Sequence, residues 1–173
     1  MDIRRVATGY DGDGKAMVAS DTAVQGIRTG PWEFHLLWGT DAKARFPDDG
    51  ARPHAPNFFP PLEGCRFIVM TLEPESWPQP APADPSAALA EIEAKLPGLL
   101  APMEADGMHA TNSIDFEYVI EGEVTLELDD GREVLLKAGD TLVQNGTRHR
   151  WHNRSSRPCR IVLCLVGAHR VGA

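Results

Sequence analysis

Two short motifs between residues 107 and 153 carry the residue types that bind metal ions. The first motif contains His109 and Asp115, and the second contains His149. Imidazole and carboxylate groups together form a ligand set that divalent metals accept in tetrahedral or octahedral geometry. Each of these residues lies on or beside an apolar, strand-like run. The sequence therefore predicts a metal site with His109, Asp115 and His149 as its ligands.

Strand periodicity indicates which neighbouring side chains would share a cavity with these ligands. Asp115, Glu117 and Val119 alternate along one predicted strand, so they lie on one face of it. His149 and Trp151 share a face of another strand, and such a polar face between apolar strands suits the interior of a ligand-holding barrel. We expect Val119 and Trp151 to contact the substrate. Glu117 is a candidate general acid or base, or an alternate ligand, but it is equally compatible with a charge at a strand edge that reaches water.

The spacing of the two motifs resembles that of the cupin superfamily. The first cupin motif is matched from His109 to Gly122, and the second from Gly139 through Gly146 and His149 to Asn153. The resemblance covers residues 105 to about 167. It implies an all-β fold, the double-stranded β-helix or jelly-roll barrel of cupins. It also implies a divalent metal, Fe, Mn, Ni or Zn, as the cofactor.

The sequence departs from the cupin pattern at two ligand positions. Thr111 replaces the second histidine of the first motif, and Asp115 replaces its glutamate. Thr111 could bind weakly, orient a water or substrate, or fill space. What remains is a set of two histidines and one carboxylate. Two interpretations stay open: either a divalent metal is bound, or the histidines are hydrogen-bonded pocket residues and Asp115 pairs with one of them.

The rest of the chain predicts short strands and a single clear helix. Proline and glycine punctuate the sequence, so residues 41–61 are expected to form a loop and residues 73–85 an extended connector. A helix is expected over 88–96, with Asp84 as its N-cap and Pro85 in its first turn. Strands are expected over 4–8, 15–20, 32–38, 66–72, 116–120, 124–128, 134–137, 141–144 and 160–166.

These elements suggest one cupin domain spanning residues 1–173. Residues 1–104 would supply N-terminal strands, the proline-rich connector and the helix, and residues 105–167 would form the barrel core. We expect the N-terminal strands to extend one sheet, with one or two short helices packed outside. Closure of the barrel would remove the exposed strand edges that so many short strands present.

Composition and charge limit the possible partners. The formal net charge of -8 and the pI near 5.2 argue against nucleic acid and against an anionic membrane surface, because both need a basic face. No apolar segment follows the N-terminal residues, and the odd number of cysteines, three, matches no disulfide or zinc pattern. A cytoplasmic location is therefore expected.

Two functions fit these observations. The first is a metal-dependent enzyme that acts on a small organic molecule such as an aromatic, keto or carboxylic acid, in the manner of a dioxygenase, isomerase, decarboxylase or lyase. The second is a non-catalytic cupin that binds a small molecule without metal, which would explain Thr111 directly. We also expect a homodimer, because Trp32, Phe34, Leu36 and Trp38 form one apolar strand face. The alternative is that this face lines the core of one subunit.

Overall fold

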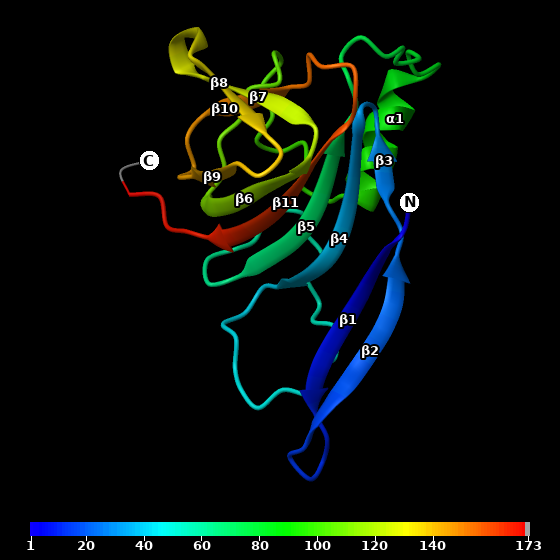
Figure 1. Cartoon of the computed structure of the whole chain (residues 1–173), viewed down its shortest axis with the longest axis vertical. Coiled ribbons are helices and arrows are strands. Elements are labelled where there is room, and N and C mark those ends of the chain that lie inside the picture. The colour runs from blue at the N-terminus through cyan, green and yellow to red at the C-terminus, as the bar shows by residue number, and fades with distance from the viewer. Residues whose placement is uncertain (172–173) are drawn as a thin grey trace.

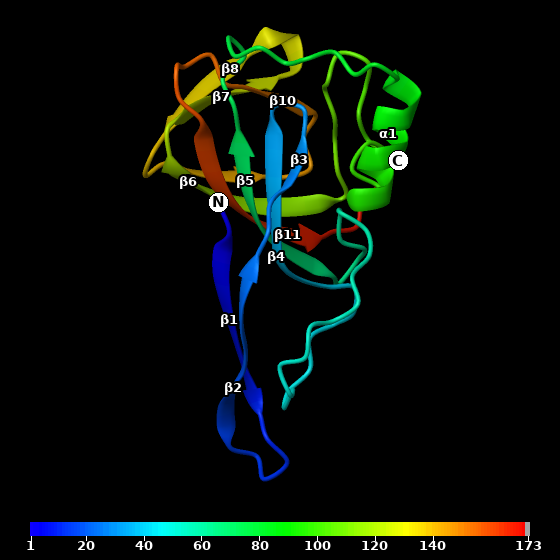
Figure 2. The same ribbon diagram turned by 90° about the vertical axis from the view of Figure 1, so that its right-hand side faces the viewer.

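Two β-sheets that face each other form the body of the molecule, and a hairpin projects from them (Figures 1 and 2). The computed structural model describes residues 1–171, so the last two positions of the predicted domain lie outside the described residues. Within this range the larger sheet has the strand order β3-β4-β5-β11-β6-β9, and the smaller has the order β10-β7-β8. The strands are β1 (Ile3–Tyr10), β2 (Ala16–Val24), β3 (Ile27–Thr29), β4 (Trp32–Thr40), β5 (Cys65–Leu72), β6 (Ser113–Glu121), β7 (Glu123–Leu128), β8 (Glu133–Lys137), β9 (Thr141–Gln144), β10 (His149–His152) and β11 (Cys159–Gly167).

The expected mostly-β, cupin-like fold is confirmed, but the closed barrel is not. The two sheets are not joined by hydrogen bonds into one closed sheet. The physical reason lies in the length of the edge strands. The strands at the sheet edges, β3, β9, β8 and β10, have only three to five residues each. Short edge strands present few unpaired backbone groups to other chains. The two sheets therefore avoid edge-to-edge aggregation without closing into a barrel.

The N-terminal strands extend the larger sheet only in part. Strands β3, β4 and β5 join it beside β11, as expected. Strands β1 and β2 instead pair with each other and point away from the sheets in both views (Figures 1 and 2). Arg5 anchors the hairpin, because its guanidinium lies 5.5 Å from the centre of the Trp38 ring and donates to the carbonyl of Leu37.

A β-bulge in β4 interrupts the apolar face that the sequence predicted. The pairing of β4 with β5 shifts between Leu36 and Trp38, which breaks the alternation of side chains at that point. Phe34 is buried in the core, and Trp32 and Leu36 pack against it, whereas Trp38 meets Arg5. The face that suggested a dimer thus lines one chain's own core.

The helix α1 (Pro85–Lys95) begins as the sequence predicts and ends one residue earlier. The Asp84 carboxylate accepts hydrogen bonds from the backbone amides of Ser86 and Ala87, and Pro85 occupies the first turn. Leu96, just after the helix, is fully buried. Leu89, within the helix, is 54% exposed and faces solvent. No helix within residues 1–171 is long and apolar enough to cross a membrane.

Candidate active site

Strand β6 brings a row of polar side chains into the space between the two sheets. Ser113, Asp115, Glu117 and Val119 alternate along β6 and are all buried, whereas Phe116 between them is half exposed on the outer face. The sequence therefore predicted the shared face correctly. Glu117 is only 6% exposed, which excludes its interpretation as an edge charge that reaches water.

Backbone pairing between two segments that are distant in the sequence brings the two histidines together. His109 and His149 exchange backbone hydrogen bonds of 2.9 Å in an isolated antiparallel bridge. Gly146 allows this approach, because its φ is +60° and a Cβ there would lie 2.8 Å from the carbonyl oxygen of Thr111. Arg170 also joins the motifs by donating to the carbonyls of Thr111 and Gly146. Nothing in the sequence pattern indicated this role for Arg170.

The two imidazole rings lie beside each other and both line the same cavity. Their centroids are 4.2 Å apart. The Nδ1 of His149 lies 2.9 Å from the carbonyl oxygen of Thr147, and the Nδ1 of His109 lies 3.3 Å from that of Gly107. A neutral ring that donates from Nδ1 keeps its Nε2 lone pair free. Burial, reinforced by the charge of His109, lowers the pKa of His149 to about 4. Burial also lowers the pKa of His109. Both rings are therefore neutral near pH 7.

The carboxyl groups of Asp115 and Glu117 are buried, and burial disfavours their ionised forms. Burial raises the pKa of Asp115 to about 6, although a hydrogen bond with Ser113 opposes the change. Burial, together with the charge of Asp115, raises the pKa of Glu117 to about 8. Among the described residues, Asp115 Oδ1 and Glu117 Oε2 have no hydrogen-bond partner. Buried oxygens without a partner are costly unless a ligand or ion satisfies them.

These groups lie at the polar end of an apolar cavity of about 290 Å³. Thr111 and Trp151 line it, whereas Val119 lies in the core and does not. The Thr111 hydroxyl is 2.9 Å from that of Ser113, a residue that β6 periodicity could have included among the candidates. The sequence motifs did not indicate the opposite wall of the cavity, because its residues come largely from the N-terminal part of the chain. It includes Trp32, Phe34, Phe58, Phe59 and Met70.

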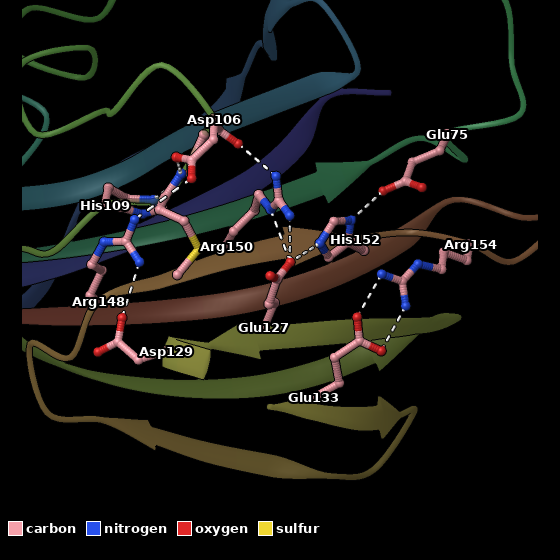
Figure 3. A network of polar contacts seen from close by, with 12 residues as sticks. Glu75, Asp106, His109, Glu127, Asp129, Glu133, Arg148, Arg150, His152 and Arg154 are labelled. Carbon is pink, nitrogen blue, oxygen red and sulfur yellow. Dashed lines mark hydrogen bonds and ion pairs between the residues drawn. The ribbon is translucent and has the colours of Figure 1, made fainter. Parts of the chain in front are cut away.

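The donor chemistry of the site fits a divalent metal, although the three predicted ligands do not converge closely. In the described part of the chain, the three groups whose ligand atoms lie within 4.8 Å of one another are Glu127, Glu133 and His152. These residues form an outer cluster, joined to arginines in a network of polar contacts (Figure 3), and none of the three lines the cavity. Arg150 pairs with Glu127 at 2.6 Å, and Arg154 pairs with Glu133 at 2.7 Å. Because its carboxylates already bind arginines, the outer cluster is an ion-pair network and not a vacant cation site.

Comparisons with known proteins agree with the motifs. A family model described as "Cupin domain" matches residues 99–166. "Phomopsin biosynthesis cluster protein C'" of Diaporthe leptostromiformis is 54% identical over 48 residues, which are 28% of this chain and 25% of that protein. "Cupin-domain-containing oxidoreductase virC" of Hypocrea virens is 43% identical over 69 residues, 38% of this chain and 36% of that protein. The chain thus spans only about a quarter to a third of the length of these curated relatives.

Some solved structures are also similar to this chain. "A predicted oxalate decarboxylase" from Thermotoga maritima has a TM-score of 0.45 and 15% identity, with 83% of this chain and 93% of that chain covered. An RmlC-like cupin from Methanocaldococcus jannaschii has a TM-score of 0.39 and 15% identity, with coverages of 60% and 70%. Residues 99–166 of this chain therefore match the cupin-domain family model and carry both cupin-like motifs.

Proposed function

We propose that this chain is a metal-dependent cupin enzyme that acts on a small organic substrate. The observation that carries the proposal is the grouping of two neutral imidazoles with free Nε2 atoms and two buried carboxyl groups with unpartnered oxygens. These groups share the polar end of one apolar cavity. Neutral imidazole and carboxylate oxygen are the donors that Fe, Mn, Ni and Zn accept.

In this proposal, His109, His149 and Asp115 hold the metal, and Glu117 handles protons. When bound, a divalent metal would supply Lewis acidity toward a carbonyl oxygen or, as iron, chemistry with dioxygen. Glu117 is protonated near neutral pH, so its carboxyl group donates a proton to substrate and takes one back. The apolar wall excludes water and orients the substrate. Of the reaction types that the superfamily includes, the oxidoreductase names of several relatives favour oxidation.

The second candidate function is a binding protein that holds a small molecule without metal. The position of Thr111 favours it, because its hydroxyl already bonds to Ser113 where the cupin pattern has a third donor. The wider spacing of His109, Asp115 and His149 also favours it. The two functions differ in whether the purified protein contains metal.

Metal analysis of two matched variants tests the proposal. His149 and His152 lie on the same strand, but His149 faces the cavity and His152 belongs to the outer cluster. We expect about one equivalent of metal in the wild type, loss of it in His149→Ala, and retention in His152→Ala. Loss in His152→Ala alone would place the metal in the outer cluster. Metal-free wild-type protein, prepared without chelators, would support the binding function instead.

We also propose that the chain forms a homodimer, but through a different surface from the one the sequence suggested. The outer face of the larger sheet carries Phe67, Phe116 and Tyr118, which are 43%, 50% and 48% exposed. Phe67 and Phe116 both pair with Cys164 of β11, so the patch is continuous across strands. At roughly 200 Å² for a fully exposed aromatic side chain, these rings alone expose about 280 Å². That is enough for the apolar centre of a standard interface of about 800 Å² per partner.

A further inference from the structure

We infer that residues 98–107 form a movable flap at the mouth of the cavity, and that Arg148 is a positioning residue that keeps the flap closed by holding Glu104. The inference rests on the proposed function in one respect, since it takes this cavity as the site where a ligand binds. It adds a step that the enzyme and the binding protein would share, because either must admit a small molecule to the same groups.

The exposure of the lining residues shows where the cavity meets solvent. The carboxyl groups at its polar end are buried, whereas several other lining residues are half-buried or exposed and mark the mouth. Trp32 and Phe59 belong to the N-terminal part of this rim. The segment between α1 and β6 contributes Leu100, Met103 and Gly107. The flap therefore supplies a continuous part of the rim.

The flap is bonded largely to itself. The backbone amide of Met103 donates to the carbonyl of Leu100 at 3.1 Å, and that of Gly107 donates to the carbonyl of Glu104 at 2.9 Å. These bonds lie within the flap, so they survive if it moves as a unit. At its C-terminal end, the amide of Glu104 donates to the carbonyl of Met108 at 2.8 Å, and opening must break this bond.

Glycines near both ends of the flap provide hinges. Gly98 has a φ of +79° and Gly107 a φ of +86°. A Cβ at Gly98 would meet no atom within 4 Å, and one at Gly107 would come no closer than 3.4 Å to the Arg150 side chain. Packing therefore does not require glycine at either position, but the left-handed backbone favours it. Because glycine changes φ at little cost, these positions can absorb the backbone change of an opening flap.

Two arginines hold the flap closed. Arg148 donates from Nε and Nη2 to the two carboxylate oxygens of Glu104, each at 2.7 Å. Its Nη1 donates to Asp129, which follows β7, so the arginine is itself fixed to the smaller sheet. Arg150 donates to the carbonyl oxygen of Asp106 at 2.7 Å (Figure 3). The Glu104 side chain is 48% exposed, so water can replace the ion pair and the flap can open.

Fluorobenzene and two matched variants test the role of Glu104. A small apolar molecule of this kind suits an apolar cavity of about 290 Å³. Fluorine-19 NMR exchange measurements give its association and dissociation rate constants separately. In Glu104→Gln both rate constants should rise by roughly two- to fivefold. The dissociation constant should stay close to the wild-type value, because entry and exit share the opening step. Glu133→Gln removes the carboxylate of another two-bond pair, with Arg154, and should keep the wild-type rates.

Gly98→Ala is a second test that leaves the ion pair intact. Alanine is strained at the φ of the closed flap, so opening should become easier and both rate constants should rise. Gly139 has a φ of +97° in the turn before β9, and an added Cβ there also meets no atom within 4 Å. Gly139→Ala therefore carries a similar strain outside the flap and should leave both rate constants unchanged.

Several results would overturn the inference. Unchanged rate constants in Glu104→Gln, or faster dissociation alone with a matching loss of affinity, would reject the positioning role of Arg148. Unchanged rate constants in Gly98→Ala would reject the hinge. An equal rise in the two control variants would show general destabilisation instead of gating. Absence of fluorobenzene binding to the wild type would reject an accessible cavity and the flap with it.

The location of the probe can be checked in the unaltered protein. Met70 and Met103 line the cavity, whereas Met17 lies on the projecting hairpin. With methionine methyl groups labelled by carbon-13, fluorobenzene should shift the signals of Met70 and Met103 and leave that of Met17 unchanged. Shifts confined to other methionines would place the probe outside the cavity and reject the inference.

The result is separable from that of the proposed function. Each protein is used as purified, and its metal content is determined on the same sample. Gated entry into a protein that holds no metal would uphold the flap and support the binding function. One equivalent of metal together with rate constants that do not respond to Glu104→Gln and Gly98→Ala would uphold the enzyme proposal and reject the flap.

Discussion

Replacing Glu117 by Gln should make the metal-free protein less sensitive to pH between 6.5 and 8. In the folded chain the pKa of Glu117 is raised from its ordinary value of 4.5 to about 8. A carboxyl group with a raised pKa stabilises the fold fully below its unfolded pKa, and this contribution is lost as pH rises toward the folded pKa. In this window an unfolded Glu117 is ionised while the folded one keeps most of its proton. The wild-type free energy of unfolding must therefore fall as pH rises.

The size of the change follows from the shift. Each pH unit in which the unfolded group is ionised and the folded group is not corresponds to about 1.36 kcal/mol. Over the 1.5 units from pH 6.5 to 8, with Glu117 half ionised at the upper end, the wild type should lose about 1.5 kcal/mol. For a chain of this length that is a fall in Tm of roughly 3 to 6 °C. Asp115, whose pKa is about 6, contributes little above pH 6.5.

Urea unfolding of chelator-treated protein at pH 6.5, 7.2 and 8 measures this slope. The free energy of unfolding of Glu117→Gln should stay almost constant over this pH range. Glu121→Gln, an exposed residue at the end of the same strand, is the matched control and should keep the wild-type slope. His109 and His149 have lowered pKa values and act in the opposite direction, but they are present in all three proteins and cancel in the comparison. Equal slopes for wild type and Glu117→Gln would refute the account of Glu117 as a buried, protonated acid.

Three further predictions concern the metal and the assembly. Asp115→Asn keeps the shape of the side chain and removes its charge, so metal affinity should fall by at least tenfold; an unchanged affinity in a metal titration would count against Asp115 as a ligand. Thr111→His adds the donor that the cupin pattern has at that position, and slower removal of metal by a chelator is expected; unchanged removal would show that the pocket lacks room for the ring. Sedimentation at micromolar concentration should give a dimer of the 18.9 kDa chain, and Phe116→Glu should yield monomer; a monomeric wild type would remove the dimer proposal.

The features of the site that depend on local periodicity were predictable. Alternation along a strand places Asp115 and Glu117 on one face whatever surrounds the strand, and burial of both residues confirms it. The same reasoning placed Val119 toward a ligand, but that residue does not line the cavity and packs in the core. Periodicity gives the face of a strand, but it does not give the extent of the cavity that the face borders.

The features that depend on long-range pairing were not predictable. The bulge between Leu36 and Trp38 is a property of how β4 pairs with β5, so the sequence of β4 alone suggested an unbroken apolar face. Likewise the wall formed by Phe34 and Phe58 comes from residues more than fifty positions before His109, and only the completed sheet brings them to the polar groups. The error about the dimer surface had the same origin, because an apolar strand face is compatible with either a core or an interface.

The contrast between the two polar clusters shows why residue types alone do not locate a metal site. Glu127, Glu133 and His152 converge more closely than His109, Asp115 and His149, and spacing alone would select them. Yet each carboxylate of the outer cluster already has an arginine partner, so a cation would have to displace an existing ion pair. The inner groups have the opposite character. Their imidazoles are held neutral by burial, and their carboxyl oxygens are desolvated without partners. The energy gained by satisfying those oxygens favours the inner site, even though its ligands must move closer to bind one ion.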